Sequence, residues 1–172
     1  MLVGNLASYS EFARNADAII GMDLLQLISF TVDFGARKLV FDPTVQRAYL
    51  ASGDPMAECM ILELQVQGRP VHLIVDSGLS GIMLYEERLR KRVPNLRTAG
   101  TLRNVTMGGR VQAKEATLPD VLLGKTNRDV SVLLVPSPAA DVLPEIDGIV
   151  GIDALRAHRV HFDFEGKTLL WE

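Results

Sequence analysis

Cysteine, histidine and long apolar stretches are scarce in this chain of 172 residues, and each shortage excludes a class of protein. Cys59 is the only cysteine, so neither an intrachain disulfide nor a cysteine-rich zinc site can form, and we interpret it as a small apolar filler. The three histidines, His72, His158 and His161, lie in or beside expected strands and are interpreted as structural. No metal or other cofactor is expected.

Signals for membranes and nucleic acids are also missing. No apolar stretch is long enough to cross a bilayer, and residues 1–15 lack the basic region and apolar run of a secretory signal. The net charge is −3 and no basic stripe is present, so nucleic acid is not an expected partner. The one basic cluster, Arg88 to Arg92, follows Glu86 and Glu87 and is interpreted as a solvated helix face or turn. A soluble protein without a membrane span is expected, and nothing in the sequence assigns a compartment.

An internal repeat organises the chain. Residues 17–41 align with residues 147–171 at a constant offset of 130, without a gap, and eight of the 25 positions are identical. The identical pairs are Asp17/Asp147, Ile19/Ile149, Gly21/Gly151, Asp23/Asp153, Leu25/Leu155, Asp33/Asp163, Phe34/Phe164 and Leu39/Leu169. Residues 57–146 have no counterpart, because the equivalent positions fall before residue 1. The repeat is therefore incomplete within this sequence.

The simplest division gives three parts. Residues 1–45 are the C-terminal tail of an incomplete first repeat, residues 46–56 are a connector, and residues 57–172 are one complete unit. Either the chain is a fragment of a longer two-lobed protein, or the tail serves another purpose, such as packing on the complete unit as an extra helix and hairpin. In both cases its apolar run at 19–27 must be covered.

Short strands with regular turns predict an all-β fold, a closed barrel or sandwich. A short helix is expected from Asp153 to Ala157, near the C-terminus, and a helix–hairpin tail of the first repeat precedes the barrel. Expected strands are 60–67 and 71–75 around a turn at 68–70, then 82–85, a hairpin over 101–116 with Gly108 and Gly109 at its turn, 118–123, 130–135, and a last hairpin of 161–164 and 168–171.

One tripeptide carries chemistry. The apolar strand Val71 to Val75 delivers Asp76, Ser77 and Gly78 into a loop, where a carboxylate can act as a general base for water. Ser77 can hydrogen-bond across to a partner loop, and Gly78 lets a backbone N–H approach the carboxylate. Asp, Ser and Gly are also common turn residues, so on its own the tripeptide favours a plain turn.

Two further features favour catalysis. Ile149, Val150 and Gly151 precede the last hairpin, and a Gly-rich turn at 107–109 lies between them and Asp76. With this ordered set, residues 57–172 resemble the retropepsin-like aspartic proteases, in particular the bacterial aspartyl protease-like domains, and residues 15–45 resemble the C-terminal end of the same family.

The resemblance implies a role for each segment. Asp76 would be the catalytic aspartate, with Ser77 and Gly78 as its supporting loop. Met107, Gly108 and Gly109 would form a substrate-covering flap, and Ile149, Val150 and Gly151 a barrel-closing loop. Leu79 departs from the small residue that usually follows the tripeptide in this family.

The expected function is aspartic endopeptidase activity on an extended peptide or protein substrate. This chemistry needs two aspartates that share a proton, so Asp76 must meet either Asp76 of a second copy in a homodimer or an aspartate of an upstream lobe. The alternatives are an inactive lobe that binds peptides or mediates dimerisation, which Leu79 favours, and an unrelated barrel with a chance turn.

Overall fold

The computed structural model describes residues 20–21, 25–41, 59–94, 96, 98–106, 109–123, 125–137 and 145–172. Within them β-strands dominate, together with the short helix α2 and the 3-10 helix η2. The elements in chain order are β1 (Phe30–Asp33), β2 (Lys38–Phe41), β3 (Ile61–Val66), β4 (Arg69–Asp76), β5 (Ile82–Tyr85), α2 (Glu86–Arg92), β6 (Thr98–Thr106), β7 (Gly109–Leu123), β8 (Thr126–Val135), β9 (Gly148–Gly151), η2 (Ile152–Leu155), β10 (Arg159–Asp163) and β11 (Thr168–Trp171).

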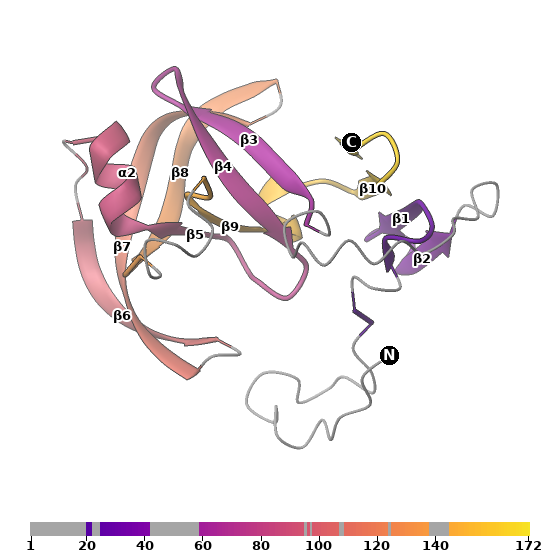
Figure 1. Cartoon of the computed structure of the whole chain (residues 1–172), viewed down its shortest axis with the longest axis horizontal. Coiled ribbons are helices and arrows are strands. Elements are labelled where there is room, and N and C mark those ends of the chain that lie inside the picture. The colour runs from indigo at the N-terminus through magenta and orange to yellow at the C-terminus, as the bar shows by residue number, and fades with distance from the viewer. Residues whose placement is uncertain are drawn as a thin grey trace.

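Six strands close into a barrel (Figure 1). They neighbour one another in the order β3, β4, β9, β5, β8 and β7, and β7 returns to β3 through the pairs Gln65–Leu122 and Val66–Val121. Strand β6 lies outside this ring as the hairpin partner of β7. The closed β-barrel expected from the sequence is confirmed.

The β3–β4 hairpin turns one residue earlier than the sequence indicated. Gln67 and Gly68 both have positive φ, 53° and 74°, which is the backbone that a two-residue turn needs to match the twist of its strands. Arg69 and Pro70, which were expected in the turn, already pair with Val66 and Gln65. The expected turn at 68–70 was therefore wrong by its last two residues.

Strand β7 joins two segments that the sequence separated. It runs through the second arm of the hairpin expected at 101–116 and through the strand expected at 118–123. Its pairing with β8 shifts between Leu118 and Val121, and Asp120 has a φ of 56°. Pro119 lacks the N–H of a regular ladder, so the strand bulges there instead of ending.

The expected helix near the C-terminus is a short 3-10 helix. η2 covers Ile152–Leu155, and Arg156 in the left-handed conformation ends it before Ala157. The final hairpin expected at 161–164 and 168–171 is present as β10 and β11.

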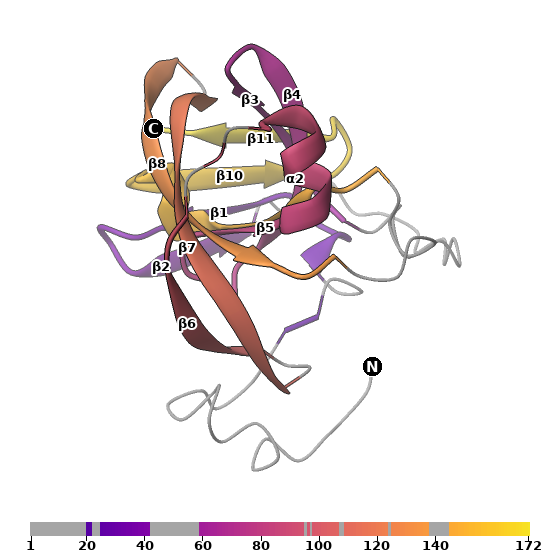
Figure 2. The same ribbon diagram turned by 90° about the vertical axis from the view of Figure 1, so that its left-hand side faces the viewer.

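A second sheet of four strands, in the order β11, β10, β1 and β2, lies beside the barrel (Figure 2). The hairpin part of the expected tail is therefore present, and it pairs through β1 with β10. The helical part of the tail falls mostly outside the described residues.

The core fills the barrel and extends under this second sheet. Alternate residues of β3 and β4 point inward, and Leu64, Val66, Val71 and Leu73 are all at most 2% exposed. Val160 and Phe162 of β10 join the same core. Phe30 of β1 is also buried in this core, so the barrel, β1 and the β10–β11 hairpin are one packed unit.

Candidate active site

Asp76 is the last residue of β4, and its side chain is exposed to solvent. The backbone N–H of Gly78 donates a hydrogen bond to Oδ1 of Asp76 at 2.8 Å. The N–H of Leu79 donates to the backbone carbonyl of Asp76 at 3.3 Å. The contact predicted for Gly78 is confirmed, and the carboxylate is held by its own loop while facing water.

Strand β9 lies between the two strands that flank this loop. It runs parallel to β4, with Asp76 opposite Gly151, and antiparallel to β5. The N–H of Gly151 donates to the carbonyl of Gly81 at 2.7 Å. A Cβ at Gly151 would lie 2.2 Å from the backbone oxygen of Leu79, so only glycine fits there.

The predicted barrel-closing residues therefore lie beside the Asp76 loop. Val150 is fully buried and pairs with Val75, while Ile149 packs on a second apolar cluster behind the loop. That cluster contains Met83, Tyr85, Ala113, Val135 and Ile146. Each of the three residues has a packing reason for its type.

Asp153 holds the far end of the loop, a role that the sequence reasoning missed. It begins the helix expected at 153–157, but its Oδ2 also accepts a hydrogen bond from Ser80 Oγ at 2.7 Å. Its Oδ1 accepts one from the N–H of Gly81 at 2.9 Å. Burial alone would raise the pKa of Asp153, but these hydrogen bonds outweigh it and hold the pKa below its ordinary value. Asp153 therefore fixes the exit of the loop that Asp76 begins.

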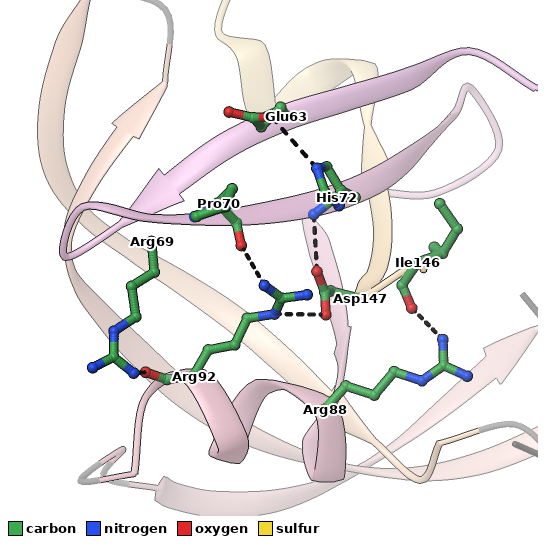
Figure 3. A network of polar contacts seen from close by, with 8 residues as sticks. All are labelled: Glu63, Arg69, Pro70, His72, Arg88, Arg92, Ile146 and Asp147. Atoms are coloured by element: carbon green, nitrogen blue, oxygen red, sulfur yellow. Dashed lines mark hydrogen bonds and ion pairs between the residues drawn. The ribbon is translucent and has the colours of Figure 1, made fainter. Parts of the chain in front are cut away.

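Asp147 is a second missed residue (Figure 3). It is 2% exposed and forms an ion pair with Arg92 of α2, with Nε of Arg92 and Oδ1 of Asp147 3.1 Å apart. Its Oδ2 accepts a hydrogen bond from the N–H of His72 at 3.0 Å. The start of β9 is thereby tied to both α2 and β4.

The basic cluster lies on a helix, α2, which was one of the two structures expected for it, the other being a turn. Its side chains do not all face solvent, because two of them bind residues that precede β9. Arg90 pairs with Glu86 one turn earlier, at 2.9 Å. Arg88 donates to the carbonyl of Ile146, and Arg92 reaches Asp147 (Figure 3). A sequence alone shows the spacing along α2 but does not show that Asp147 lies opposite it.

Leu79 is accommodated by packing. Its side chain is half-buried and contacts the second apolar cluster, behind the loop. Its carbonyl lies against Gly151, as described above. Leu79 is larger than the residue that the family usually has here, and it packs against apolar side chains.

The predicted flap is described only in part. Met107 and Gly108 lie outside the described residues, and Gly109 opens β7 opposite Thr106 of β6. In Figure 1 the C-terminal end of β6 and the loop after β4 both lie on the lower side of the barrel. Covering of Asp76 by this hairpin stays a prediction.

The described residues contain neither a metal-binding cluster nor a helix that could span a membrane. Among those residues, no group of three or more His, Cys, Asp or Glu side chains is arranged to hold a metal ion. No helix within them is long and apolar enough to cross a membrane.

The chain is similar to one known protein family. The family model described as aspartyl protease matches residues 62–154. Among solved structures, EIAV protease complexed with the inhibitor HBY-793 is similar at 15% identity with a TM-score of 0.46, over 64% of this chain and 92% of that one. A retropepsin-like aspartic protease from Rickettsia conorii is similar at 20% identity with a TM-score of 0.42, over 58% of this chain and 78% of that one. No curated protein matches the sequence significantly.

Proposed function

This chain belongs to the aspartyl protease family, and from that premise we propose that Asp76 supplies one of two paired aspartates in an endopeptidase. The observation that carries the proposal is the exposed Asp76 carboxylate, held at the end of β4 by the Gly78 N–H. The proposed catalytic lobe spans residues 57–172.

The chemistry follows the general pattern of aspartic proteases. Two carboxylates that share one site cannot both be ionised, so the pair holds one proton. The ionised member takes a proton from water, the water oxygen attacks the scissile carbonyl carbon, and the protonated member donates to the carbonyl oxygen. Collapse of the resulting tetrahedral species breaks the C–N bond after the amine is protonated.

The surrounding residues have supporting roles in this proposal. Gly78 orients the Asp76 carboxylate, and Ser77 would hydrogen-bond to the loop that carries the second aspartate. Asp153 and Gly151 hold the loop from behind. An extended peptide would lie under Met107, Gly108 and Gly109 and use strand-like main-chain hydrogen bonds.

The second aspartate must come from outside the described residues, either from another subunit or from another lobe. Asp147, Asp153 and Asp163 do not qualify, because each is engaged in structural hydrogen bonds. The runner-up function, an inactive lobe that binds peptides or mediates dimerisation, rests on Leu79, on the incomplete first repeat and on the single Asp-Ser-Gly loop in this sequence. The packing of Leu79 described above weakens that reading.

Replacing Asp76 tests the proposal. We expect Asp76→Asn to lose peptide cleavage across acidic and neutral pH, since an amide cannot take a proton from water. The measurement is cleavage of a peptide library, with and without a transition-state peptide inhibitor. Glu87→Gln, which removes an exposed carboxylate on α2, is the matched control and should cleave normally. Peptide binding that is unchanged in Asp76→Asn, with no cleavage by the wild type at any pH, would establish the binding module instead.

A further inference from the structure

The side of the sheet that carries Asp76 also carries a row of apolar side chains. Residues two apart in a strand share a side, so Ile74 lies on the same side of β4 as Asp76. Ile74 is paired with Ile149 of β9. The row continues through two further pairs, Ile149 with Met83 and Met83 with Leu133. An apolar row therefore crosses β4, β9, β5 and β8 next to Asp76.

This row is only partly buried. Met83 is 8% exposed, whereas Ile74, Ile149 and Leu133 are half-buried. All four side chains contribute to the second apolar cluster described above. A peptide that reaches the Asp76 carboxylate therefore lies close to apolar atoms, which bind an apolar side chain by removing its surface from water.

Leu79 adds its side chain to the row beside Asp76. Gly151 is paired with Asp76, so a Cβ at Gly151 would point to the side of the sheet that carries Asp76 and Ile149. That Cβ would lie 2.2 Å from the backbone oxygen of Leu79, so Leu79 occupies the space that a side chain at Gly151 would fill. The Leu79 side chain is half-buried and packs on the same cluster as Ile149.

The loop holds the Leu79 backbone from both directions. The N–H of Leu79 donates to the carbonyl of Asp76 at 3.3 Å. On its other side, Ser80 Oγ and the Gly81 N–H donate to Asp153 at 2.7 Å and 2.9 Å. Moving Leu79 would break these hydrogen bonds, so a ligand at the row meets the leucine side chain in a fixed place.

We propose that Leu79 is a specificity-determining residue, which fills part of the apolar row and so selects a small side chain, such as alanine, at the substrate residue that contacts the row. This inference rests on the proposed function, because it assigns the substrate of that same site. One surplus methylene group in a filled apolar pocket lowers kcat/KM by roughly 10-fold or more. A substrate with a large side chain at this position is therefore cleaved much more slowly than one with alanine.

Paired substrates test this size selection. In a peptide library, each position around the scissile bond carries alanine or phenylalanine in turn, and kcat/KM is measured for both. At one position we expect the wild type to favour alanine, and Leu79→Ala to raise the phenylalanine-to-alanine ratio by about 10-fold or more. Leu79→Val, with a side chain of intermediate size, should raise the ratio less. Because both peptides meet the same enzyme preparation, the ratio does not depend on how much of a variant is folded.

Leu170→Ala is the matched control, because it makes the same change at a side chain of β11 that is 61% exposed. Its ratios should equal those of the wild type at every position. A wild type that cleaves phenylalanine peptides as well as alanine peptides at every position would overturn the proposal. A ratio in Leu79→Ala that equals the ratio in Leu170→Ala would do the same.

Peptide binding separates this inference from the proposed function. The same peptides with a reduced amide, in which a methylene group replaces the scissile carbonyl, bind without being cleaved, and calorimetry gives the ratio of their Kd values. If the wild type cleaves nothing but binds the alanine form more tightly, and Leu79→Ala loses that preference, the endopeptidase assignment fails and the size selection holds. Cleavage without a size preference refutes the size selection alone. Absence of both binding and cleavage overturns both.

Discussion

The β1–β2 and β10–β11 hairpins share a register and a turn, but both strands of the second pack on the core, whereas in the first only β1 does. Local chemistry explains what they share, since the same Asp-capped turn with one left-handed residue fixes each pairing. What stands opposite explains the difference, since Trp171 meets the barrel and Phe41 does not. The comparison teaches that a repeated hairpin keeps its strand register in two places of the fold, and that the exposure of its apolar side chains shows whether other residues pack on it.

The largest loss of stability should come from the hairpin whose two strands both pack on the core. Phe162 is 5% exposed and stacks on Phe30 with ring centroids 4.7 Å apart. We expect Phe162→Ala to lower the free energy of unfolding by about 3–5 kcal/mol through lost burial and the cavity left behind. The control Leu170→Ala, on the exposed face, should change it by less than about 0.5 kcal/mol. Chemical denaturation measures both, and similar losses would show that the two faces are not distinguished as described.

A smaller loss of stability is expected when the ion pair between Asp147 and Arg92 is removed. Asp147→Asn leaves Arg92 facing a neutral amide at the start of β9. We expect the free energy of unfolding to fall by about 2 kcal/mol, less than for a fully buried pair because Arg92 is about a third exposed. Denaturation of Asp147→Asn and of the exposed control Glu87→Gln provides the measurement. An effect no larger than that of the control would mean that the ion pair does not hold β9.

The pH dependence should be common to both hairpins. The Ala36 N–H, with Arg159, holds the pKa of Asp33 below its ordinary value of 3.8, and the Gly166 N–H does the same for Asp163. A carboxyl with a lowered folded pKa stabilises the fold above its unfolded pKa, and this contribution is lost as the pH falls through the folded pKa. Stability should therefore decline at acidic pH, below about 4.

The Asn variants isolate this contribution. We expect Asp33→Asn and Asp163→Asn each to lower Tm at neutral pH and to flatten its decline on acidification. Thermal melts across the acidic range, compared with the wild type and with Glu87→Gln, measure the slope. Curves that run parallel to the wild type would contradict the assigned hydrogen bonds.

The smallest effect is expected at the turns. A Cβ at Gly166 would lie 2.5 Å from Oδ2 of Asp163, which is a movable side-chain atom. The equivalent position in the other turn already carries Ala36, with its N–H 2.7 Å from Asp33. Gly166→Ala should therefore change the free energy of unfolding by less than about 1 kcal/mol. A loss well beyond that in denaturation would show that the two turns differ in backbone.

The sequence predicted the features that depend on neighbouring residues. The closed barrel, the final hairpin and the Gly78 contact with Asp76 follow from strand patterns and turn residues that lie close together along the chain. The roles of Asp147 and Asp153 depend on partners 55 and 73 positions away, Arg92 and Ser80. Acidic residues in turn-like segments carry no local sign of such partners.

The repeat was visible in the sequence, but its meaning was not. The offset of 130 predicted two like hairpins and left open whether the first belonged to a missing lobe or packed as an extra element. The pairing of β1 with β10 and the burial of Phe30 show that this hairpin packs on the complete unit, and its origin in a missing lobe stays a prediction. Strand partners across such a separation cannot be read from composition or periodicity.

Mixing wild-type and Asp76→Asn polypeptides tests the central claim most directly, that Asp76 is one half of a paired-aspartate site. The two proteins are combined in varying ratios, unfolded, refolded together and assayed for peptide cleavage. Activity should fall with the wild-type fraction, in direct proportion where another lobe supplies the second aspartate and with the square of that fraction where Asp76 of another copy supplies it. Activity that does not depend on the wild-type fraction would show that Asp76 takes no part in cleavage, and would contradict the account.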